Sequence, residues 1–154
     1  MSNSYADISN LLSEYTHRFD LGNLEGAAQL FRHARVQTAP DTWIDYKQLL
    51  DIWRDGVIMY DDGTPKTKHV CTNAVINIDE ENDAADSKSY YVVYQQTDTL
   101  PLQPIAAGRY YDKFERVGGV WRFSERNYML LDHVGNMEEH SNVWEQIKAH
   151  FLKS

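Results

Sequence analysis

The sequence predicts an α+β fold in which N-terminal helices pack on a strongly curved antiparallel sheet. In the first third of the chain, apolar residues recur at three- and four-residue steps, which is typical of amphipathic helices. Strand-like stretches joined by short turns fill most of the rest, and this order of elements is typical of helices on one face of a sheet. We see no linker or repeat in the 154 residues and expect one domain over 1–154, with a core at about 5–132 and a C-terminal helix at about 141–152.

The first third contains two expected helices with a glycine between them. Gly22 suits the C-terminal end of the first helix, and Asn23 suits the N-cap of the second, which runs to Phe31. Helical spacing returns from about residue 46 to residue 60. The apolar stripe of the first helix consists of Tyr5, Ile8, Leu11, Leu12, Tyr15 and Phe19.

Four long strand-like stretches follow a brief strand expected near Val36. A turn at "EEND" separates the first two, and a "GG" hairpin turn separates the last two. Such turns between consecutive strands predict an antiparallel meander. The four stretches span residues 68–79, 84–98, 105–117 and 120–132.

Composition and charge narrow the classes of partner. The net charge of −8 argues against nucleic acid and anionic membranes, which both require a basic surface. The single cysteine, Cys71, excludes an intramolecular disulfide and argues against a thiolate zinc site. Neither a signal peptide nor a membrane-spanning stretch is visible, so we expect a soluble, cytoplasmic protein without nucleic-acid or membrane partners.

His69 stands at the start of the first long strand, which otherwise consists mainly of Val, Ile, Ala, Thr and Asn. Alternation places it on a half-polar face, opposite an apolar face that reads as the packing side. A half-polar face suits solvent or the wall of a polar pocket, and the pattern alone does not choose between them. The face consists of His69, Cys71, Asn73, Val75 and Asn77.

Three further residues are candidates for a site at the open end of the sheet. Asp20 ends the first helix, Arg126 lies on the last strand, and Tyr15 precedes Asp20 by five residues. An imidazole held by a carboxylate is a general base with a fixed tautomer, and a guanidinium can stabilise a developing anion.

Structural roles for the same residues carry more weight when the residues are considered alone. An Asp at a helix end is usually a cap or solvated, and a strand His is usually a satisfied structural residue. For Arg126 the structural alternative is a surface ion pair, with neighbours of Glu125 or with Asp132. The aromatic run 90–94 reads as core. The remaining histidines show no metal-ligand spacing: His17, His33, His133, His140 and His150.

Three motifs shift this balance, because together they resemble a known family. "Y-x4-D" ends the first helix, "TKH" opens a strand, and "AAGRYYDKFERVGGVWRFSERN" forms the last hairpin. The pattern resembles the SnoaL-like branch of the nuclear transport factor 2-like superfamily over roughly residues 5–132. Within that branch it is most similar to lindane dehydrochlorinase, bile-acid 7α-dehydratase and scytalone dehydratase. The resemblance implies a cone-shaped α+β barrel and a cofactor-free lyase with an Asp–His dyad.

Carried over by position, the resemblance implies a role for each candidate. His69 would abstract a proton, Asp20 would orient the ring, and Arg126 with Tyr15 would assist the leaving group; no metal or cofactor is expected. The walls of the substrate pocket would come from Trp53, Val57, Val75, Tyr94 and Phe114.

The expected function is that of a dehydratase-like or dehydrohalogenase-like lyase, or an isomerase, acting on a small hydrophobic, cyclic molecule. The alternative is a non-catalytic binding or assembly subunit of the same fold, such as the small subunit of a ring-hydroxylating dioxygenase, because fold does not fix function. The exposed sheet face of this fold predicts a homo-oligomer, a dimer or a trimer.

Overall fold

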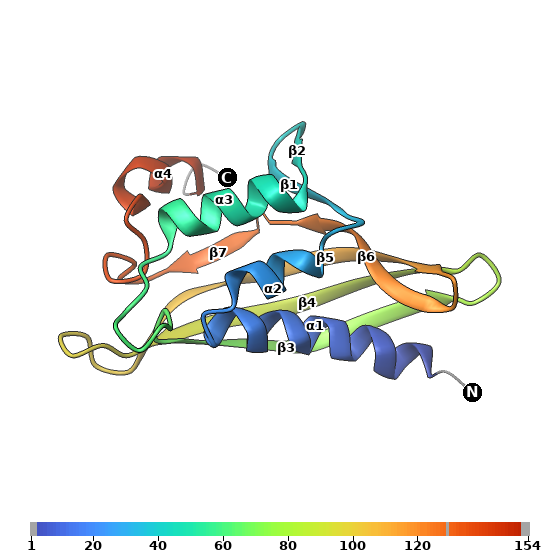
Figure 1. Cartoon of the computed structure of the whole chain (residues 1–154), viewed down its shortest axis with the longest axis horizontal. Helices are drawn as coiled ribbons and strands as arrows, with labels where there is room; N and C mark the ends of the chain where they lie inside the picture. The colour runs from blue at the N-terminus through green and yellow to red at the C-terminus, as the bar shows by residue number, and fades with distance from the viewer. Residues whose placement is uncertain (1–2, 129, 152–154) are drawn as a thin grey trace.

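The computed structural model describes residues 3–128 and 130–151, which contain helices at both ends of the chain and a sheet between them (Figure 1). The C-terminal helix begins at Trp144 rather than at residue 141, and residue 152 lies outside the described residues. The helices are α1 (Ser4–Asp20), α2 (Leu24–Gln29), α3 (Tyr46–Gly56) and α4 (Trp144–Phe151). The strands are β1 (Arg35–Ala39), β2 (Thr42–Ile44), β3 (Thr67–Asp79), β4 (Ala84–Gln95), β5 (Gln103–Val117), β6 (Val120–Asn127) and β7 (Leu131–Val134).

The sheet is curved and open. Its strands follow the order β2-β1-β6-β5-β4-β3, and the described neighbours are antiparallel except for the parallel pair β1 and β6. β6 pairs with the second half of β5, and β7 pairs with residues 106–108 in its first half. In Figure 1, α1 and α2 cross in front of β3, β4 and β5, while α3 and α4 lie toward β7. The α+β fold with N-terminal helices on a curved sheet is thus confirmed, but the sheet does not close into a barrel.

Local sequence signals explain where the helices begin and end. The Asn3 side chain accepts a hydrogen bond from the Ala6 N–H at the start of α1. Asp45 and Gln48 form a capping box at the start of α3, each side chain accepting from the backbone of the other. α3 then ends at Gly56, four residues before the end that helical spacing predicted.

A bulge in β3 changes which side chains face the helices. The strand register shifts between Thr72 and Val75, and Asn73 has a left-handed backbone with φ of 55°. An extra residue reverses the alternation beyond it, so His69 before the bulge and Ile76 after it both face inward. Val75 is 60% exposed, and the expected inward orientation of Val75 is therefore wrong.

A second bulge, in β6, has a similar effect on Arg126. The β5–β6 register shifts between Lys113 and Phe114, which leaves Ser124 as an extra residue in β6. Phe123 and Arg126 are both fully buried although strict alternation would place them on opposite faces. The bulge therefore turns a guanidinium into the interior.

The main core lies between α1, α2, α3 and the inner sheet face, and aromatic side chains dominate it. The ring of Phe123 lies 4.7 Å from that of Phe31 and 4.9 Å from that of Phe114, centroid to centroid. Gly108 allows β5 to pass close to the chain before β7, because a Cβ there would lie 2.1 Å from the carbonyl oxygen of Leu130.

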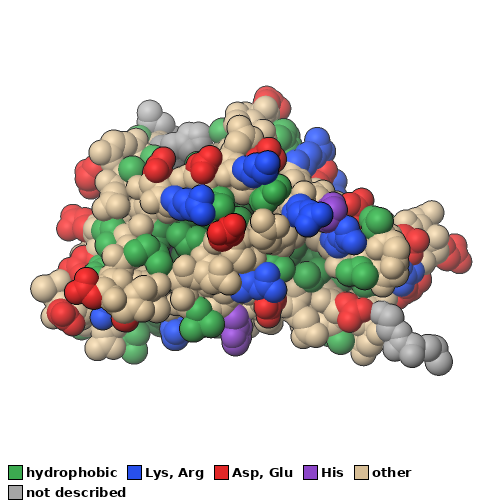
Figure 2. Space-filling model, in the orientation of Figure 1, with side chains coloured by type: hydrophobic (Ala, Val, Ile, Leu, Met, Phe, Trp, Pro, Cys, Tyr) green, Lys and Arg blue, Asp and Glu red, His purple; other side chains and the backbone are tan. Residues whose placement is uncertain are grey.

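Charges of both signs are mixed on the face in Figure 2, where Lys and Arg side chains alternate with Asp and Glu. Within residues 3–128 and 130–151, no helix is long and apolar enough to cross a membrane. In the same ranges, no three His, Cys, Asp or Glu side chains are grouped so that they could hold a metal ion.

Candidate functional site

Asp20 and His69 form a hydrogen-bonded pair at the junction of α1 and β3. The Nδ1 atom of His69 lies 2.6 Å from Oδ1 of Asp20, and the backbone N–H of His69 donates to Oδ2 at 2.7 Å. The hydroxyl of Thr67 also donates to Oδ1, at 2.7 Å. The side chains of His69 and Asp20 are only 6% and 8% exposed. The carboxylate is thus held by three donors away from bulk water.

The end of α1 positions the carboxylate. Asp20 is the last residue of the helix, and Gly22 follows with φ of 80°, a left-handed conformation that favours glycine. The N–H of Gly22 donates to the carbonyl of Phe19, and a Cβ on Gly22 would lie 1.8 Å from the carbonyl oxygen of Gly63. Glycine at this position therefore lets the chain leave the helix directly after Asp20, so that the side chain reaches the start of β3.

Electrostatics fix the tautomer of the imidazole. Burial raises the pKa of Asp20, but the hydrogen bonds from His69 and Thr67 and the charge of His69 outweigh it, and the pKa lies below its ordinary range. Asp20 is therefore a carboxylate at neutral pH. Because a carboxylate only accepts hydrogen bonds, Nδ1 of His69 carries the proton and Nε2 is the basic atom of the neutral ring.

Aromatic rings surround the imidazole on its inner side. The ring of Phe19 lies 4.9 Å and that of Tyr15 lies 6.2 Å from the imidazole, centroid to centroid, both edge-on. His69 is therefore a packed side chain rather than a residue at a solvent-filled mouth.

His69 lies in the wall of a cavity of about 380 Å³. Most of the other lining side chains are apolar or aromatic, and they come from α3, β4, β5, β7 and the C-terminal segment. Two residues expected in the pocket wall line this cavity: Trp53 of α3 and Val57, which directly follows the helix. A cavity of this size and character suits a small hydrophobic molecule with a few oriented polar groups.

Tyrosines form a layer next to the imidazole. Tyr110 and Tyr128 line the cavity, whereas Tyr15 lies behind them, 1% exposed, with its ring edge-on to that of Tyr110 at 6.0 Å between centroids. The Nε1–H of Trp53 donates to the hydroxyl of Tyr128 at 3.2 Å. Burial raises the pKa of Tyr15, Tyr110 and Tyr128, so all three hydroxyls remain protonated and can donate hydrogen bonds at neutral pH.

Arg126 lies one layer further from the cavity. It is fully buried and makes a two-point ion pair with Asp112, through Nε at 2.7 Å and Nη2 at 2.9 Å. Its guanidinium carbon lies 3.9 Å from the centroid of the Tyr110 ring and 4.6 Å from that of Tyr15. The cavity wall does not include Arg126, but the charge of Arg126 lowers the pKa of three tyrosines in that wall against the effect of burial, Tyr91, Tyr110 and Tyr128.

Three of the residues expected in the pocket wall are placed elsewhere. Val75 and Tyr94 lie on the outer face of the sheet, 60% and 37% exposed, and Phe114 is buried in the main core beside Phe123. The bulge at Asn73 explains Val75. Alternation along β4, which buries Ser87, Ser89 and Val93, explains why Tyr94 faces outward.

Several residues of the cavity wall were missed in the sequence. Tyr91 and Val93 line it from β4, and their position follows from the same alternation. Tyr110 lies on the same buried face of β5 as Asp112 and Phe114, so the alternation along that strand could also have predicted its position. His140 also lines the cavity, and it lies on a connection after β7 where no periodicity marks it.

The chain matches a known protein family but no curated protein sequence. A family model described as a SnoaL-like domain matches residues 1–127. No curated protein sequence matches the chain.

Solved structures share the fold at low sequence identity. A Mycobacterium tuberculosis protein of unknown function is 21% identical with a TM-score of 0.65, over 85% of this chain and 77% of its own. A Novosphingobium aromaticivorans protein provisionally described as a scytalone dehydratase is 22% identical with a TM-score of 0.64, over 86% of both chains. The beta subunit of a provisionally assigned aromatic-ring-hydroxylating dioxygenase from the same species is 20% identical with a TM-score of 0.65, over 88% of this chain and 94% of its own.

Proposed function

Because the chain belongs to the SnoaL-like domain family, of the nuclear transport factor 2-like superfamily, we propose that it is a cofactor-independent lyase, of the dehydratase or dehydrohalogenase type, or an isomerase. Its substrate would be a small hydrophobic, cyclic molecule held in the cavity beside His69. One observation supports this most strongly: the carboxylate-bound imidazole of His69 lies in the wall of a mainly apolar cavity. An oriented base next to a shielded pocket is the arrangement that proton abstraction from carbon requires.

The proposed elimination moves one proton and two bonding pairs, those of the C–H bond and of the bond to the leaving group. Nε2 of His69 takes a proton from a substrate carbon, and the electrons of the broken C–H bond form a new double bond to the neighbouring carbon. That carbon loses its substituent together with the bonding electrons. A departing hydroxide receives the proton back from the imidazolium and leaves as water, whereas a halide leaves as such and the proton passes to solvent. In an isomerase the proton returns to another carbon.

Asp20, the tyrosines and Arg126 support this step in different ways. Asp20 stabilises the imidazolium and holds its orientation, as a buried carboxylate does beside a catalytic histidine. The hydroxyls of Tyr110 and Tyr128 offer hydrogen bonds to the leaving group or to developing negative charge. Arg126 acts as a positioning residue: its charge lies against the rings of Tyr15 and Tyr110 and lowers their pKa relative to burial alone, which makes them better donors.

Turnover of a panel of cyclic β-hydroxy ketones tests the proposal, with the absorbance of the conjugated product as the readout. His69→Asn is the sharpest variant, since its amide can still donate to Asp20 but provides no base. Both His69→Asn and His69→Ala should lower turnover by about 10²- to 10⁴-fold. Asp20→Asn should also lower it, and the double variant should be little worse than either single one, because the two residues act as a unit.

Two matched controls separate chemistry from architecture. Thr67→Val removes one donor to Asp20 without touching the imidazole and should leave most activity, and His133→Asn removes an exposed histidine outside the cavity. A folded His69→Asn variant that turns over substrate at the parent's rate would refute the proposed role of His69.

The outer face of the sheet favours a second candidate function, as an assembly subunit. Val70, Tyr90 and Tyr111 are between 39% and 56% exposed there, and such a face is suited to contact with another chain. Self-association as a dimer or trimer is compatible with either function. Gel filtration and a pull-down distinguish them, since a stable homo-oligomer supports the enzyme and an obligate partner of different sequence supports the assembly subunit.

A further inference from the structure

His140 is a second histidine of the cavity wall, from a part of the chain outside the family match. It lies between β7 and α4, whereas the family model ends at residue 127. Its side chain lines the same cavity as His69, and the residue is only 9% exposed. Besides burial, the charge of His69 lowers the pKa of His140, an effect that Asp20 opposes.

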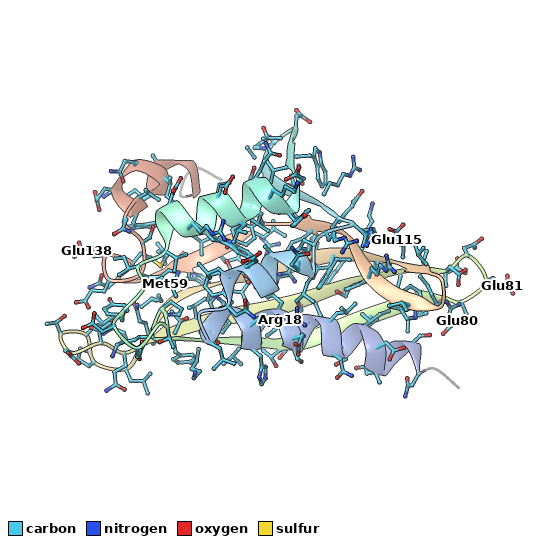
Figure 3. All side chains as sticks on the ribbon, in the orientation of Figure 1. Arg18, Met59, Glu80, Glu81, Glu115 and Glu138 are labelled. Carbon is cyan, nitrogen blue, oxygen red and sulfur yellow. The ribbon has the colours of Figure 1, made fainter. Side chains whose placement is uncertain are left out.

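The backbone around His140 is held firmly by its neighbours. The carbonyl of Glu139 accepts hydrogen bonds from the hydroxyl of Tyr60 at 2.6 Å and from Nε2 of Gln95 at 3.0 Å. The carbonyl of His140 accepts from the N–H of Ile58 at 2.9 Å. The labels of Met59 and Glu138 in Figure 3 mark the two loops that meet here, at the α4 end of the molecule. These bonds fix the backbone from which the imidazole enters the cavity.

The imidazole itself has no such partner. Nδ1 of His140 is buried and has no hydrogen-bond partner among the described residues. An unpaired buried polar atom lowers stability, and because His140 lines the cavity, a molecule bound there can supply the ring with a hydrogen-bond partner. Burial, followed by the charge of His69, lowers the pKa of His140 to about 4, although Asp20 opposes the shift. At neutral pH the ring is therefore uncharged, with one N–H donor and one acceptor nitrogen.

We propose that His140 is a substrate-positioning residue that hydrogen-bonds an oxygen of the substrate, a carbonyl or a hydroxyl, in the cavity whose wall it shares with His69. A carbonyl accepts from the ring N–H, and a hydroxyl can pair with either nitrogen. A hydrocarbon or an alkyl halide leaves the ring unpaired, so the cavity selects oxygenated cyclic substrates over halogenated ones. The inference rests on the proposed function for the choice of site, but it concerns binding and is tested without turnover.

The test compares two ligands, α-tetralone and tetralin, that differ only in a carbonyl in place of one CH₂ group, by equilibrium dialysis against the whole chain. His140→Leu should lower the ratio of the ketone's to the hydrocarbon's association constant by about 2- to 13-fold, the range of one net hydrogen bond. His140→Gln, which keeps a donor and an acceptor, should retain most of the ratio. His133→Leu, an exposed histidine near His140 in sequence, should leave it unchanged.

A thermal melt of the same variants guards against a purely structural role. Because Nδ1 of the ring has no partner among the described residues, His140→Leu should melt no lower than the parent. An equal ratio in the parent and in His140→Leu, or failure of both ligands to bind, would overturn the inference. A ratio that falls only in His69→Leu would assign the oxygen contact to His69 and overturn the inference while leaving the proposed function intact. Loss of turnover in the His69 variants is scored separately, so the two hypotheses can fail independently.

Discussion

His140→Leu should make the protein more resistant to mild acid. In the folded protein the pKa of His140 is lowered to about 4 from an ordinary 6.5, chiefly by burial. Between these two pKa values the unfolded state binds more protons than the folded state. Protonation of His140 therefore does not lower the free energy of unfolding above pH 6.5, and it lowers that free energy progressively as the pH falls toward 4. At pH 4 the unfolded ring is almost fully protonated and the folded ring is half protonated, which corresponds to a loss of about 3 kcal/mol in the free energy of unfolding.

Urea denaturation from pH 7.5 to pH 4 measures this loss in the parent and in His140→Leu. The difference between the two free energies of unfolding should grow toward acid pH by about 3 kcal/mol in favour of the variant. Asp20 and His69 face His140 from α1 and β3 and are present in both proteins, so their direct contributions largely cancel. A constant difference across this range would refute the claim that His140 is a buried, neutral ring.

Substitutions at three further positions, Arg126, Asn73 and Thr67, test the surroundings of the site. Arg126→Met should destabilise the protein by about 3–5 kcal/mol because it leaves Asp112 buried and unpaired, and adding Asp112→Leu should recover most of the loss in chemical denaturation; a mild single variant would contradict the buried pair. Asn73→Val should lower stability by about 1–2 kcal/mol because Asn73 has φ of 55°, whereas Asn73→Gly should be near neutral, and equal melting points for the two would argue against the bulge. Thr67→Val should raise the pKa of Asp20, which NMR can follow, because it removes one hydrogen bond to the carboxylate. The stability that this carboxylate supplies at neutral pH should then be lost at a higher pH on acidification. An unchanged pKa would mean that the Thr67 hydroxyl does not stabilise the carboxylate.

The fold and the meeting of Asp20 with His69 could be predicted because their signals are local or motif-like. The apolar stripe predicts α1, Gly22 predicts its end close to Asp20, and "TKH" marks the start of the neighbouring strand. The separation of 49 residues between Asp20 and His69 does not by itself predict that the two side chains meet. It acquired meaning only through the resemblance to a family with such a pair.

The pocket wall was harder to predict, because strand bulges and burial of charge depend on tertiary structure. A left-handed Asn73 shows no clear signal in "CTNAV", yet it moves Val75 to the outer face. The extra residue Ser124 likewise turns Arg126 inward, where Asp112 and the tyrosine rings compensate its charge. Alternation without these insertions assigns the wrong face to every residue beyond them.

His140 could not be found from sequence at all. Its position depends on three donors far away in the chain: the N–H of Ile58 donates to the carbonyl of His140, and the side chains of Tyr60 and Gln95 donate to the carbonyl of the preceding residue. None of these contacts leaves a periodic pattern. A histidine in "EEHSN" reads as an ordinary turn residue until the cavity behind it is known.

Proton exchange at carbon tests the central claim most directly, because it requires the base but no leaving group. The measurement is deuterium incorporation at the carbon next to the carbonyl of α-tetralone in D₂O, followed by NMR for the parent, His69→Asn, Asp20→Asn and the double variant. If the Asp20–His69 pair abstracts protons in the cavity, the parent accelerates exchange above buffer, His69→Asn loses about 10²- to 10⁴-fold of that rate and the double variant loses little more. Exchange at the parent's rate in a folded His69→Asn variant, or no acceleration by a parent that binds the ketone, would contradict the account.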